Sequence, residues 1–560
     1  MAKSSCSNKA FALTTLTLLL AQTTASYSQA LPDAGQIMRE LRQTSPGGET
    51  LPAPAGVTEN SEQSASDDIR ITVTQFDIEG NTSIPTNELQ DLLTDQLGRR
   101  LSLADLKNAA ARLTALYRER GFLVARAYLP VQDVQDGKIK ILILEGNIAQ
   151  LKLRNASSLS DERAQAFLNQ AVAGSAIRSD RIDRALLLLN DVPGVGAVRA
   201  TLQPGSSVGT SDLLVDIDPG SRFAGNLALD NYGSRYTGNT RLSGTLYVNN
   251  LAGIGDQAVI SGLLSDRKLG YGRVGYSVPL GGNGLRVGTF LSSTRYELAR
   301  EFAVLDAHGT ARNLSVYATY PLVRTQRANL TGSVSLEKRR LSDRIDAIGT
   351  ANDKNARVFS LGLSGSYRDA LGGGGLSSFD LATNFGKLAI ESPVALSIDA
   401  VSARTNGSYR KMYFTGSRLQ RISDTDSLWL AVSAQWASKN LDSSEKFILG
   451  GASGVRAYPQ GEAIGDQGYL ASVEYRHNFS EALQAALFYD AGSVSINRDV
   501  FDATASNKRT LSGMGLGFNA VLGGADLKAS LAWRASGDAL SVPAGSSKSP
   551  TLWLRASKPF

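Results

Sequence analysis

The chain has 560 residues, a formal net charge of +6 and a hydrophobic content of 42%. This length is too great for one ordinary domain, and the modest, dispersed positive charge without a basic run argues against nucleic acid as a partner. No apolar run approaches the roughly 20 residues that a membrane-spanning helix needs, so the bulk of the chain is expected to be soluble or to form a β-barrel.

Residues 1–30 have the pattern of a secretory signal peptide. The apolar run Ala10–Ala21 follows Lys3 and Lys9, and Ser28-Gln29-Ala30 supplies small residues at a cleavage site. The alternative for this segment is a buried core helix.

Cysteine and histidine are too scarce for most catalytic or metal chemistry. Cys6 is the only cysteine and lies in the predicted signal peptide, so the mature chain has no thiol for a disulfide or a metal site. The two histidines, His308 and His477, are far apart in sequence. We therefore expect no cofactor, no metal centre and no enzymatic activity.

The next segments predict a short helix on a long tether. In residues 31–43, Ile37, Met38 and Leu41 recur at helical spacing. Residues 44–69 are rich in Ser, Pro, Gly and Glu without periodicity, which is typical of a flexible linker.

Two units of similar size follow, over residues 70–146 and 147–219. Each is predicted to have the element order β-α-α-β-β, which indicates an internal repeat of structure. In the first unit, Ser102 and Asp105 form a capping-box-like helix start, and Asp136-Gly137 is a hairpin signal. Two unrelated small α+β modules are the alternative.

From Arg222 onward the apolar period changes from helical spacing to two. Over residues 220–560, stretches such as Leu428–Trp436 alternate apolar and polar residues between Gly-, Asn-, Asp- and Ser-containing turns. At about 21 residues per strand and turn, this predicts roughly 16 antiparallel strands in a transmembrane β-barrel with an aqueous channel. A water-soluble β-sandwich is the alternative, and the signal peptide and the terminal Phe560 favour the outer membrane.

Strand parity separates a lipid face from a lumen face near the C-terminus. Leu483, Leu487 and Tyr489 share an apolar face, so Asp490 lies on the opposite face. A carboxylate facing lipid is costly, which places Asp490 in the lumen. The same reasoning on the preceding strand points Glu474 inward.

The block Leu449–Pro459, with Phe488–Gly492 one strand further on, resembles the signature loop of two-partner secretion transporters, the TpsB family. The family motif reads Val-Arg-Gly-Tyr, and this chain has Val455-Arg456-Ala457-Tyr458. Leu229–Gly238 resembles the opening barrel strands of the family, and Tyr117–Phe122 is typical of its first POTRA domain.

The resemblance implies two POTRA domains, at 70–146 and 147–219, and a loop near 450–468 that folds into the pore. It also implies that Arg456 pairs with Asp490, for which we expect about 1–3 kcal/mol in a wet lumen. The candidate site residues are those of the loop motif and of the facing strands: Gly454, Val455, Arg456, Tyr458, Glu474, Asp490 and Gly492.

The expected function is secretion of one large exoprotein, such as a haemolysin, adhesin or haemagglutinin-like protein with an N-terminal secretion domain. The barrel would lie in the bacterial outer membrane, in contact with its lipid, with the POTRA domains in the periplasm and the helix at 31–43 plugging the pore. The barrel-assembly machinery would insert it. The alternatives are a barrel-assembly insertase of the same superfamily and, less favoured, a passive diffusion porin.

Overall fold

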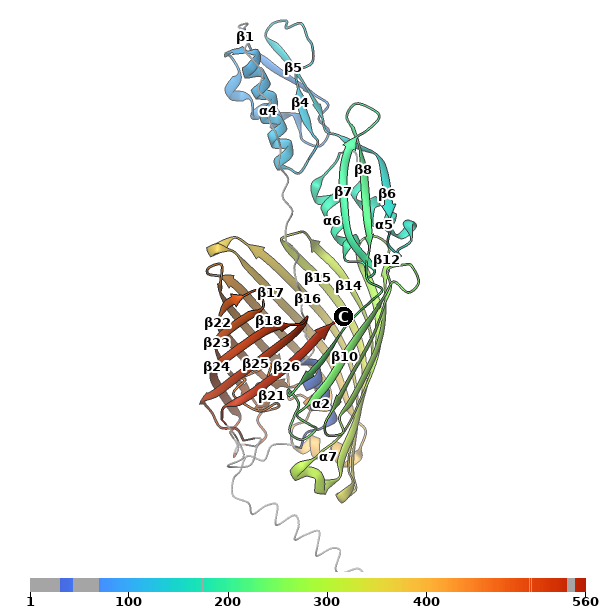
Figure 1. Cartoon of the computed structure of the whole chain (residues 1–560), viewed down its shortest axis with the longest axis vertical. Helices are drawn as coiled ribbons and strands as arrows, with labels where there is room; N and C mark the ends of the chain where they lie inside the picture. Colours follow the sequence, from blue (N-terminus) through green and yellow to red (C-terminus); the bar gives the residue numbers. More distant parts are fainter. Residues whose placement is uncertain (1–30, 44–69, 173–175, 503, 505, 541–548) are drawn as a thin grey trace, which may run out of the picture.

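The computed structural model describes residues 31–43, 70–172, 176–502, 504, 506–540 and 549–560. The predicted signal peptide and linker lie outside these residues. Two small α+β units stand in a row on one end of a large barrel, and a short helix, α2 (Ala34–Gln43), lies inside it (Figure 1). Within the described residues, no helix is long and apolar enough to cross a membrane.

The barrel is closed and every neighbouring pair of its sixteen strands is antiparallel, which confirms the predicted fold class. The strands are β9 (Phe223–Asp230), β10 (Arg241–Asn249), β11 (Gln257–Ser265), β12 (Gly270–Leu280), β13 (Leu285–Glu297), β14 (Ala307–Arg324), β15 (Ala328–Ile345), β16 (Thr350–Asp369), β17 (Gly375–Ile390), β18 (Gly407–Arg421), β19 (Asp426–Ala437), β22 (Gln467–Ser480), β23 (Leu483–Ser495), β24 (Lys508–Leu522), β25 (Ala525–Ser536) and β26 (Thr551–Pro559). The C-terminal residue helps to close the ring, because Phe560 and Gly225 exchange two backbone hydrogen bonds of 3.0 Å.

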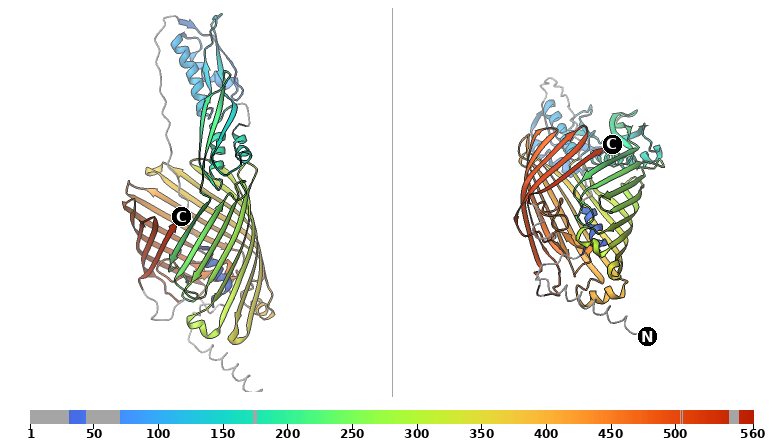
Figure 2. Two further views of the ribbon diagram at one scale, coloured as in Figure 1. Left: turned by 45° about the vertical axis from the view of Figure 1, so that its right-hand side comes forward. Right: turned by 60° about the horizontal axis from the view of Figure 1, so that its bottom comes forward.

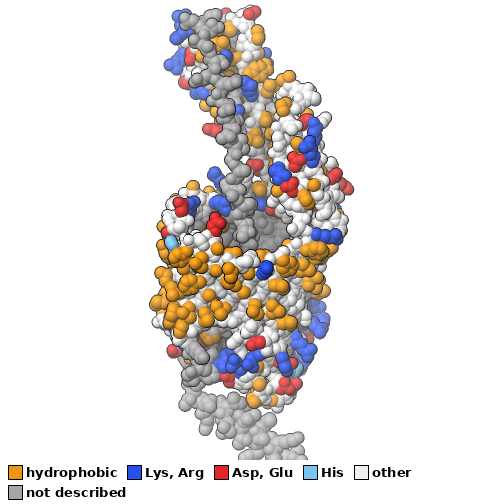
Figure 3. Space-filling view, viewed as in Figure 1, with side chains coloured by type: hydrophobic (Ala, Val, Ile, Leu, Met, Phe, Trp, Pro, Cys, Tyr) orange, Lys and Arg blue, Asp and Glu red, His pale blue; other side chains and the backbone are white. Residues whose placement is uncertain are grey.

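The period-two pattern sorts the side chains as the sequence predicts. Leu291, Leu336, Leu487 and Tyr489 are exposed on the outer face of the barrel, whereas Asp490 is fully buried inside. On the face seen in Figure 3, hydrophobic side chains form an apolar belt across the barrel. Such a belt is what the hydrocarbon layer of a membrane requires of a barrel.

The wall of the barrel has uneven height. Strands β14 and β15 have 18 residues each and β16 has 20, whereas β9 has 8 and β10 and β11 have 9. The long strands extend furthest at the end opposite the α+β units (Figure 2). Helix α7 (Pro393–Val401) lies at that end, between β17 and β18.

The first unit contains a three-stranded sheet in the order β2-β5-β4 and two helices. Its elements are β1 (Arg70–Thr72), β2 (Gln75–Glu79), α3 (Thr86–Asp91), β3 (Arg100–Ser102), α4 (Leu103–Glu119), β4 (Arg126–Tyr128) and β5 (Lys138–Leu144). The capping box at Ser102 and Asp105 forms as predicted. Helix α3 is short, since the chain leaves helical geometry at Leu93, which is buried in the core.

The second unit repeats this arrangement. Its elements are β6 (Asn147–Asn155), α5 (Asp161–Val172), α6 (Ser179–Asn190), β7 (Val195–Pro204) and β8 (Thr210–Pro219), with the sheet order β6-β8-β7. In both three-stranded sheets the first strand, β2 or β6, pairs in parallel with the last strand, and the remaining strand pairs with that last strand antiparallel. The first unit has in addition the small antiparallel pair of β1 with β3. The predicted β-α-α-β-β order is therefore present twice.

The second unit is attached directly to the turns of the barrel. Nε and Nη2 of Arg324 lie 2.7 and 2.8 Å from the two carboxylate oxygens of Asp191. Arg184 donates to the carbonyl oxygen of Pro321 at 2.6 Å, and Asn250 donates to the hydroxyl of Ser158 at 2.9 Å. These contacts fix the end of the barrel at which the α+β units stand.

Candidate functional site

Helix α2 packs its apolar face against the inner wall of the barrel. Ile37, Met38 and Leu41 are buried in one cluster with Tyr296 of β13 and Leu341 of β15. Burying an aliphatic side chain of this size is worth about 1.5–3 kcal/mol relative to full exposure. The apolar residues that recur at helical spacing within residues 31–43 thus contact strands that lie about 300 residues later in the chain. They are part of one packed cluster.

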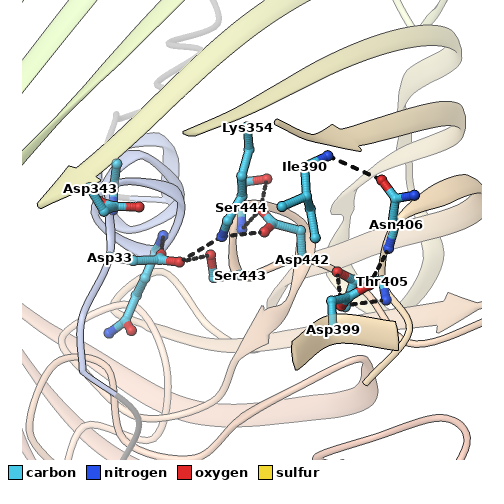
Figure 4. Close-up of polar contacts among 12 residues, drawn as sticks. Asp33, Asp343, Lys354, Ile390, Asp399, Thr405, Asn406, Asp442, Ser443 and Ser444 are labelled. Carbon is cyan, nitrogen blue, oxygen red and sulfur yellow. Dashed lines mark hydrogen bonds and ion pairs between the residues drawn. The ribbon is translucent and has the colours of Figure 1, made fainter. Parts of the chain in front are cut away.

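Polar contacts hold the N-terminus of α2 (Figure 4). Asp33 accepts from the Gln36 backbone N–H at 2.9 Å, as a helix cap does. Its other carboxylate oxygen accepts from the Ser443 hydroxyl at 2.7 Å and from Nζ of Lys354 at 3.2 Å. The N–H of Ala34 donates to Asp343 at 2.8 Å. Both the strand wall and the segment after β19 therefore contact this end of the helix.

The second half of α2 is held by its two arginines. Nε of Arg39 donates to the carbonyl oxygen of Lys446 at 3.2 Å, and its guanidinium lies 5.4 Å from the ring centre of Tyr413. Arg42 pairs with Glu337 of β15 at 3.1 Å. The helix is thus tied at both ends to groups that line the lumen.

The segment between β19 and β22 covers residues 438–466 and folds into the barrel. It contains the short helix η5 (Ser443–Glu445) and a two-stranded hairpin, β20 (Phe447–Ile448) with β21 (Ile464–Gly465). The sequence places this loop near 450–468, which is too late, because β19 already ends at Ala437. The residues that contact α2 lie in the part that this prediction leaves out.

Glu445 of η5 is the centre of a buried charge cluster that the sequence analysis misses. It forms ion pairs with Arg339 of β15 and Lys411 of β18, and Tyr409 donates to it at 2.9 Å. Burial alone would raise the pKa of Glu445, but Lys411 and Arg339 outweigh burial and hold the pKa below its ordinary value. Strand parity would have pointed Arg339 and Lys411 inward, but not their partner.

Arg456 makes the contacts expected from the loop motif. Nε and Nη2 lie 2.9 and 2.8 Å from the two carboxylate oxygens of Asp490, and Nη1 lies 2.6 Å from Glu474. The guanidinium carbon lies 3.4 Å from the ring centre of Phe488. Ser472 donates to Asp490 at 2.8 Å. The strands β22 and β23 thus bring both predicted carboxylates to one arginine.

This cluster is less exposed to solvent than the sequence analysis assumes. Asp490 is fully buried, and the Arg456 side chain is 15% exposed. Burial alone would lower the pKa of Arg456, but the hydrogen bonds and charges of Asp490 and Glu474 together outweigh burial and raise the pKa above its ordinary value. Removing one partner of a buried pair leaves an unpaired charge and costs about 3–5 kcal/mol, while the net contribution of the pair, for which we expect about 1–3 kcal/mol, stays a prediction.

The other predicted residues shape the turn around Arg456. Val455 and Tyr458 are buried, and the Tyr458 hydroxyl donates to the carbonyl oxygens of Ser536 and Gly537 at 2.5 and 2.9 Å. A Cβ at Gly454 would lie 2.1 Å from the Leu449 carbonyl oxygen, which explains the glycine.

Two small residues complete the fit of the loop against the wall. A Cβ at Gly492 would lie 2.4 Å from a methyl group of Leu449. Ala457, which stands where the TpsB motif has glycine, faces Gly513 of β24, where a Cβ would lie 2.5 Å from its methyl group. The extra methyl group of Ala457 is therefore accommodated opposite a glycine.

Comparisons with known proteins identify the family in which this arrangement occurs. The profile of the haemolysin secretion/activation proteins ShlB/FhaC/HecB matches residues 209–520, and that of the ShlB-type POTRA domain matches residues 71–146. The chain belongs to the haemolysin secretion/activation protein family. This confirms the expected two-partner secretion transporter, its place in the outer membrane and the periplasmic side of its POTRA domains. The family is one of secretion proteins.

Relatives of this transporter cover most of its length. The heme/hemopexin transporter protein HuxB of Haemophilus influenzae is 32% identical over 473 residues, which are 82% of this chain and 83% of that protein. The outer membrane transporter CdiB of Escherichia coli is 24% identical over 462 residues, which are 79% of this chain and 74% of that protein.

Solved structures support the fold of the transporter. CdiB from Escherichia coli superposes with a TM-score of 0.72 at 19% identity, and each chain is covered completely. BamA from Haemophilus ducreyi, lacking POTRA domains 1–3, gives a TM-score of 0.51 at 14% identity and covers 87% of this chain. The barrel end that carries the α+β units is thus periplasmic, and the opposite end, with α7, is extracellular.

Proposed function

We propose that the transporter secretes one large exoprotein with an N-terminal secretion domain, and that α2 and the segment 438–466 together close the pore until this partner arrives. The proposal rests on one observation: the N-terminus of α2 contacts both β16 of the barrel wall and η5 of the segment 438–466. We call this binding position the seat of α2. In this proposal α2 and the segment 438–466 occupy the path of an extended chain through the lumen. Secretion therefore requires that α2 leave its seat.

The nature of the seat suits a removable plug. Most of the contacts at both ends of α2 are side-chain hydrogen bonds and ion pairs, which a competing polar chain can replace. A ten-residue helix is marginal on its own in water, so α2 would lose its structure once displaced. Displacement of α2 thus requires that the partner compete for these polar contacts and expose the apolar face of Ile37, Met38 and Leu41.

We further propose that residues 70–219 capture the partner by adding it as a strand. In the second POTRA unit, β6 and β7 are the edges of the sheet and have 9 and 10 residues. Edge strands of this length offer unpaired backbone groups to an extended segment. In the first unit the edges are shorter, with 5 residues in β2 and 3 in β4.

The partner proposed first for a secretion assay is an exoprotein that serves heme or hemopexin transport. The chain is 31–32% identical to the HuxB proteins and 24–26% identical to the CdiB proteins. The gene that neighbours this one is the source of the partner for the assay.

A disulfide between α2 and η5 tests the plug. An ideal Cβ at Gly35 would lie 3.0 Å from Cβ of Ser444, but also 2.5 Å from Oγ of Ser443 and 2.7 Å from the backbone nitrogen of Ser444. Bridging Gly35→Cys with Ser444→Cys therefore requires that the start of α2 move away from η5, towards the roughly 3.5–4.5 Å Cβ separation of a disulfide, and the Gly35→Cys single variant must secrete as the wild type does. The mature chain has no other thiol if the signal peptide is removed. We expect oxidation to stop secretion and reduction to restore it, with each single cysteine variant as control. Secretion by the oxidised pair at the rate of the reduced pair would refute the proposal.

A further inference from the structure

A row of cations lies on the outer face of the long-stranded wall, next to the apolar belt. The row consists of exposed Arg and Lys side chains on five adjacent strands: Arg312 of β14, Lys338 and Arg340 of β15, Arg357 of β16, Lys387 of β17 and Arg410 of β18. We call this set the cation ladder. It lies towards the extracellular ends of its strands, since β14, β16 and β18 begin at that end.

Strand parity fixes the outward direction of the ladder. Ala311 and Leu341 are buried in the cluster that contains α2, and Arg339 pairs with Glu445 inside the lumen. Arg312, Lys338 and Arg340 are the chain neighbours of these inward residues, so they point to the opposite face. Outward charges near a membrane interface cost only about 0–1 kcal/mol each, which permits such a row at the edge of the belt.

The register of the strands brings like charges directly opposite one another. Arg312 is paired with Arg340, and Lys338, Arg357 and Lys387 face one another in order across three strands. Directly opposite like charges destabilise a sheet unless an anion lies between them. Among the described residues, the side chains of these five cations have no ion pair or hydrogen bond. An acidic group near the row, Glu391, binds Asn355 instead.

Apolar grooves lie directly beside the ladder. One groove of about 810 Å³ has Leu336, Phe359 and Phe385 in its lining together with Lys338, Arg357 and Lys387. A second groove, of about 660 Å³, has Leu291 and Leu314 in its lining together with Lys338 and Arg340. Each groove thus combines an apolar surface with cations, and Lys338 belongs to both.

We propose that the cation ladder binds the phosphate groups of a phosphorylated glycolipid of the outer leaflet, of the lipid A type, with acyl chains in the adjacent grooves. Arg and Lys in rows recognise phosphate by charge-assisted hydrogen bonds, and basic clusters at a membrane surface bind anionic headgroups. Four interstrand spacings of about 4.8 Å give the ladder a width of about 19 Å, enough to contact more than one phosphate. The lipid then supplies the anion that the opposed cations lack.

Lipid bound at the cation ladder would also affect the contacts on the inner face of the same strands. Inward side chains of the same strands hold α2 and η5, through Lys354, Arg339 and Lys411. A lipid that neutralises the outer cations stabilises these strands, and with them the seat of the helix. This inference goes beyond secretion itself and does not depend on the identity of the exoprotein.

The test measures binding of bisphosphorylated lipid A to the full-length protein in detergent micelles. We expect the variant Lys338→Gln/Arg357→Gln/Lys387→Gln to raise the Kd roughly tenfold or more and to lose its salt dependence. The matched control is Arg327→Gln/Arg368→Gln/Lys558→Gln, which removes three exposed cations near the periplasmic turns and the C-terminus and is expected to bind as the wild type does.

Additional variants and a folding check distinguish the possible results. Lys338→Arg/Arg357→Lys/Lys387→Arg keeps the charges and is expected to keep the binding, and heat-modifiable gel mobility verifies that each barrel is folded. If the triple Gln variant does not fold, Arg357→Gln alone is measured, with a several-fold loss expected. Wild-type affinity of the folded Gln variant, an equal loss in the periplasmic control, or complete displacement of lipid A by inorganic pyrophosphate would each overturn the proposal.

Discussion

Lys354 and Asp33 form an ion pair across 321 positions of sequence, with Nζ of the lysine 3.2 Å from a carboxylate oxygen of the aspartate. The same ammonium lies 2.8 Å from Asp442. One side chain of β16 thus joins the N-terminal helix to the segment that enters the lumen from β19.

Replacing Lys354 by Met is expected to open the pore. It leaves Asp442 buried without its cation, and loss of one partner from such a pair costs about 3–5 kcal/mol. Channel recordings in planar bilayers should show longer open times than the wild type. Lys558→Met, at an exposed lysine near the C-terminus, is the control, and an unchanged open time for Lys354→Met would contradict the role of the pair.

The pair Arg456 and Asp490 is expected to act as a unit. Arg456→Ala and Asp490→Ala should each reduce secretion strongly while the barrel still inserts, and the double variant should be little worse than either. Arg456→Lys should fail in part, because Lys cannot contact both carboxylate oxygens in one plane. Secretion assays with immunoblots of the inserted barrel give the result; additive defects would argue against the pairing.

The seat of α2 is expected to weaken as the pH rises from about 4.5 to about 7. Burial raises the pKa of Glu40 to about 7 from 4.5, against the opposing effects of the Gln36 hydrogen bond and of Arg241. A carboxyl group with a raised pKa contributes stability fully below pH 4.5 and loses it as the pH rises through about 7. Conductance should therefore increase between pH 5 and pH 8, and Glu40→Gln should remove that dependence. A pH profile unchanged by the substitution would exclude Glu40 as its cause.

In the first POTRA unit, Glu145 is expected to support stability at neutral pH. It accepts hydrogen bonds from the backbone and hydroxyl groups of Thr82 and Ser83 and from Tyr117. Burial alone would raise the pKa of Glu145, but these hydrogen bonds lower it. The contribution is thus present above pH 4.5 and is lost as the pH falls through the lowered pKa. Glu145→Gln should destabilise this unit by about 1–3 kcal/mol at pH 7, measured by limited proteolysis. Equal proteolysis rates for the two proteins at pH 7 would contradict it.

Prediction from the sequence is most successful where a regular spacing of apolar residues determines which side chains are buried. The alternation before Asp490 and Glu474 correctly places both carboxylates inside, and the spacing of Ile37, Met38 and Leu41 correctly predicts a buried helix face. Glu445 has no such signal. Its partners Arg339 and Lys411 lie 106 and 34 positions away, and their meeting depends on the path of an irregular segment. No local pattern encodes that path.

The separation of the two parts of the seat has a consequence for the order of assembly. Asp33 is synthesised 410 positions before Ser443, its hydrogen-bond partner. The helix therefore reaches the periplasm before its seat exists, since the seat needs β16, β18 and the chain up to Lys446 in place. The contacts of α2 with Lys354, Lys446 and Ser443 therefore form only after most of the barrel wall has assembled.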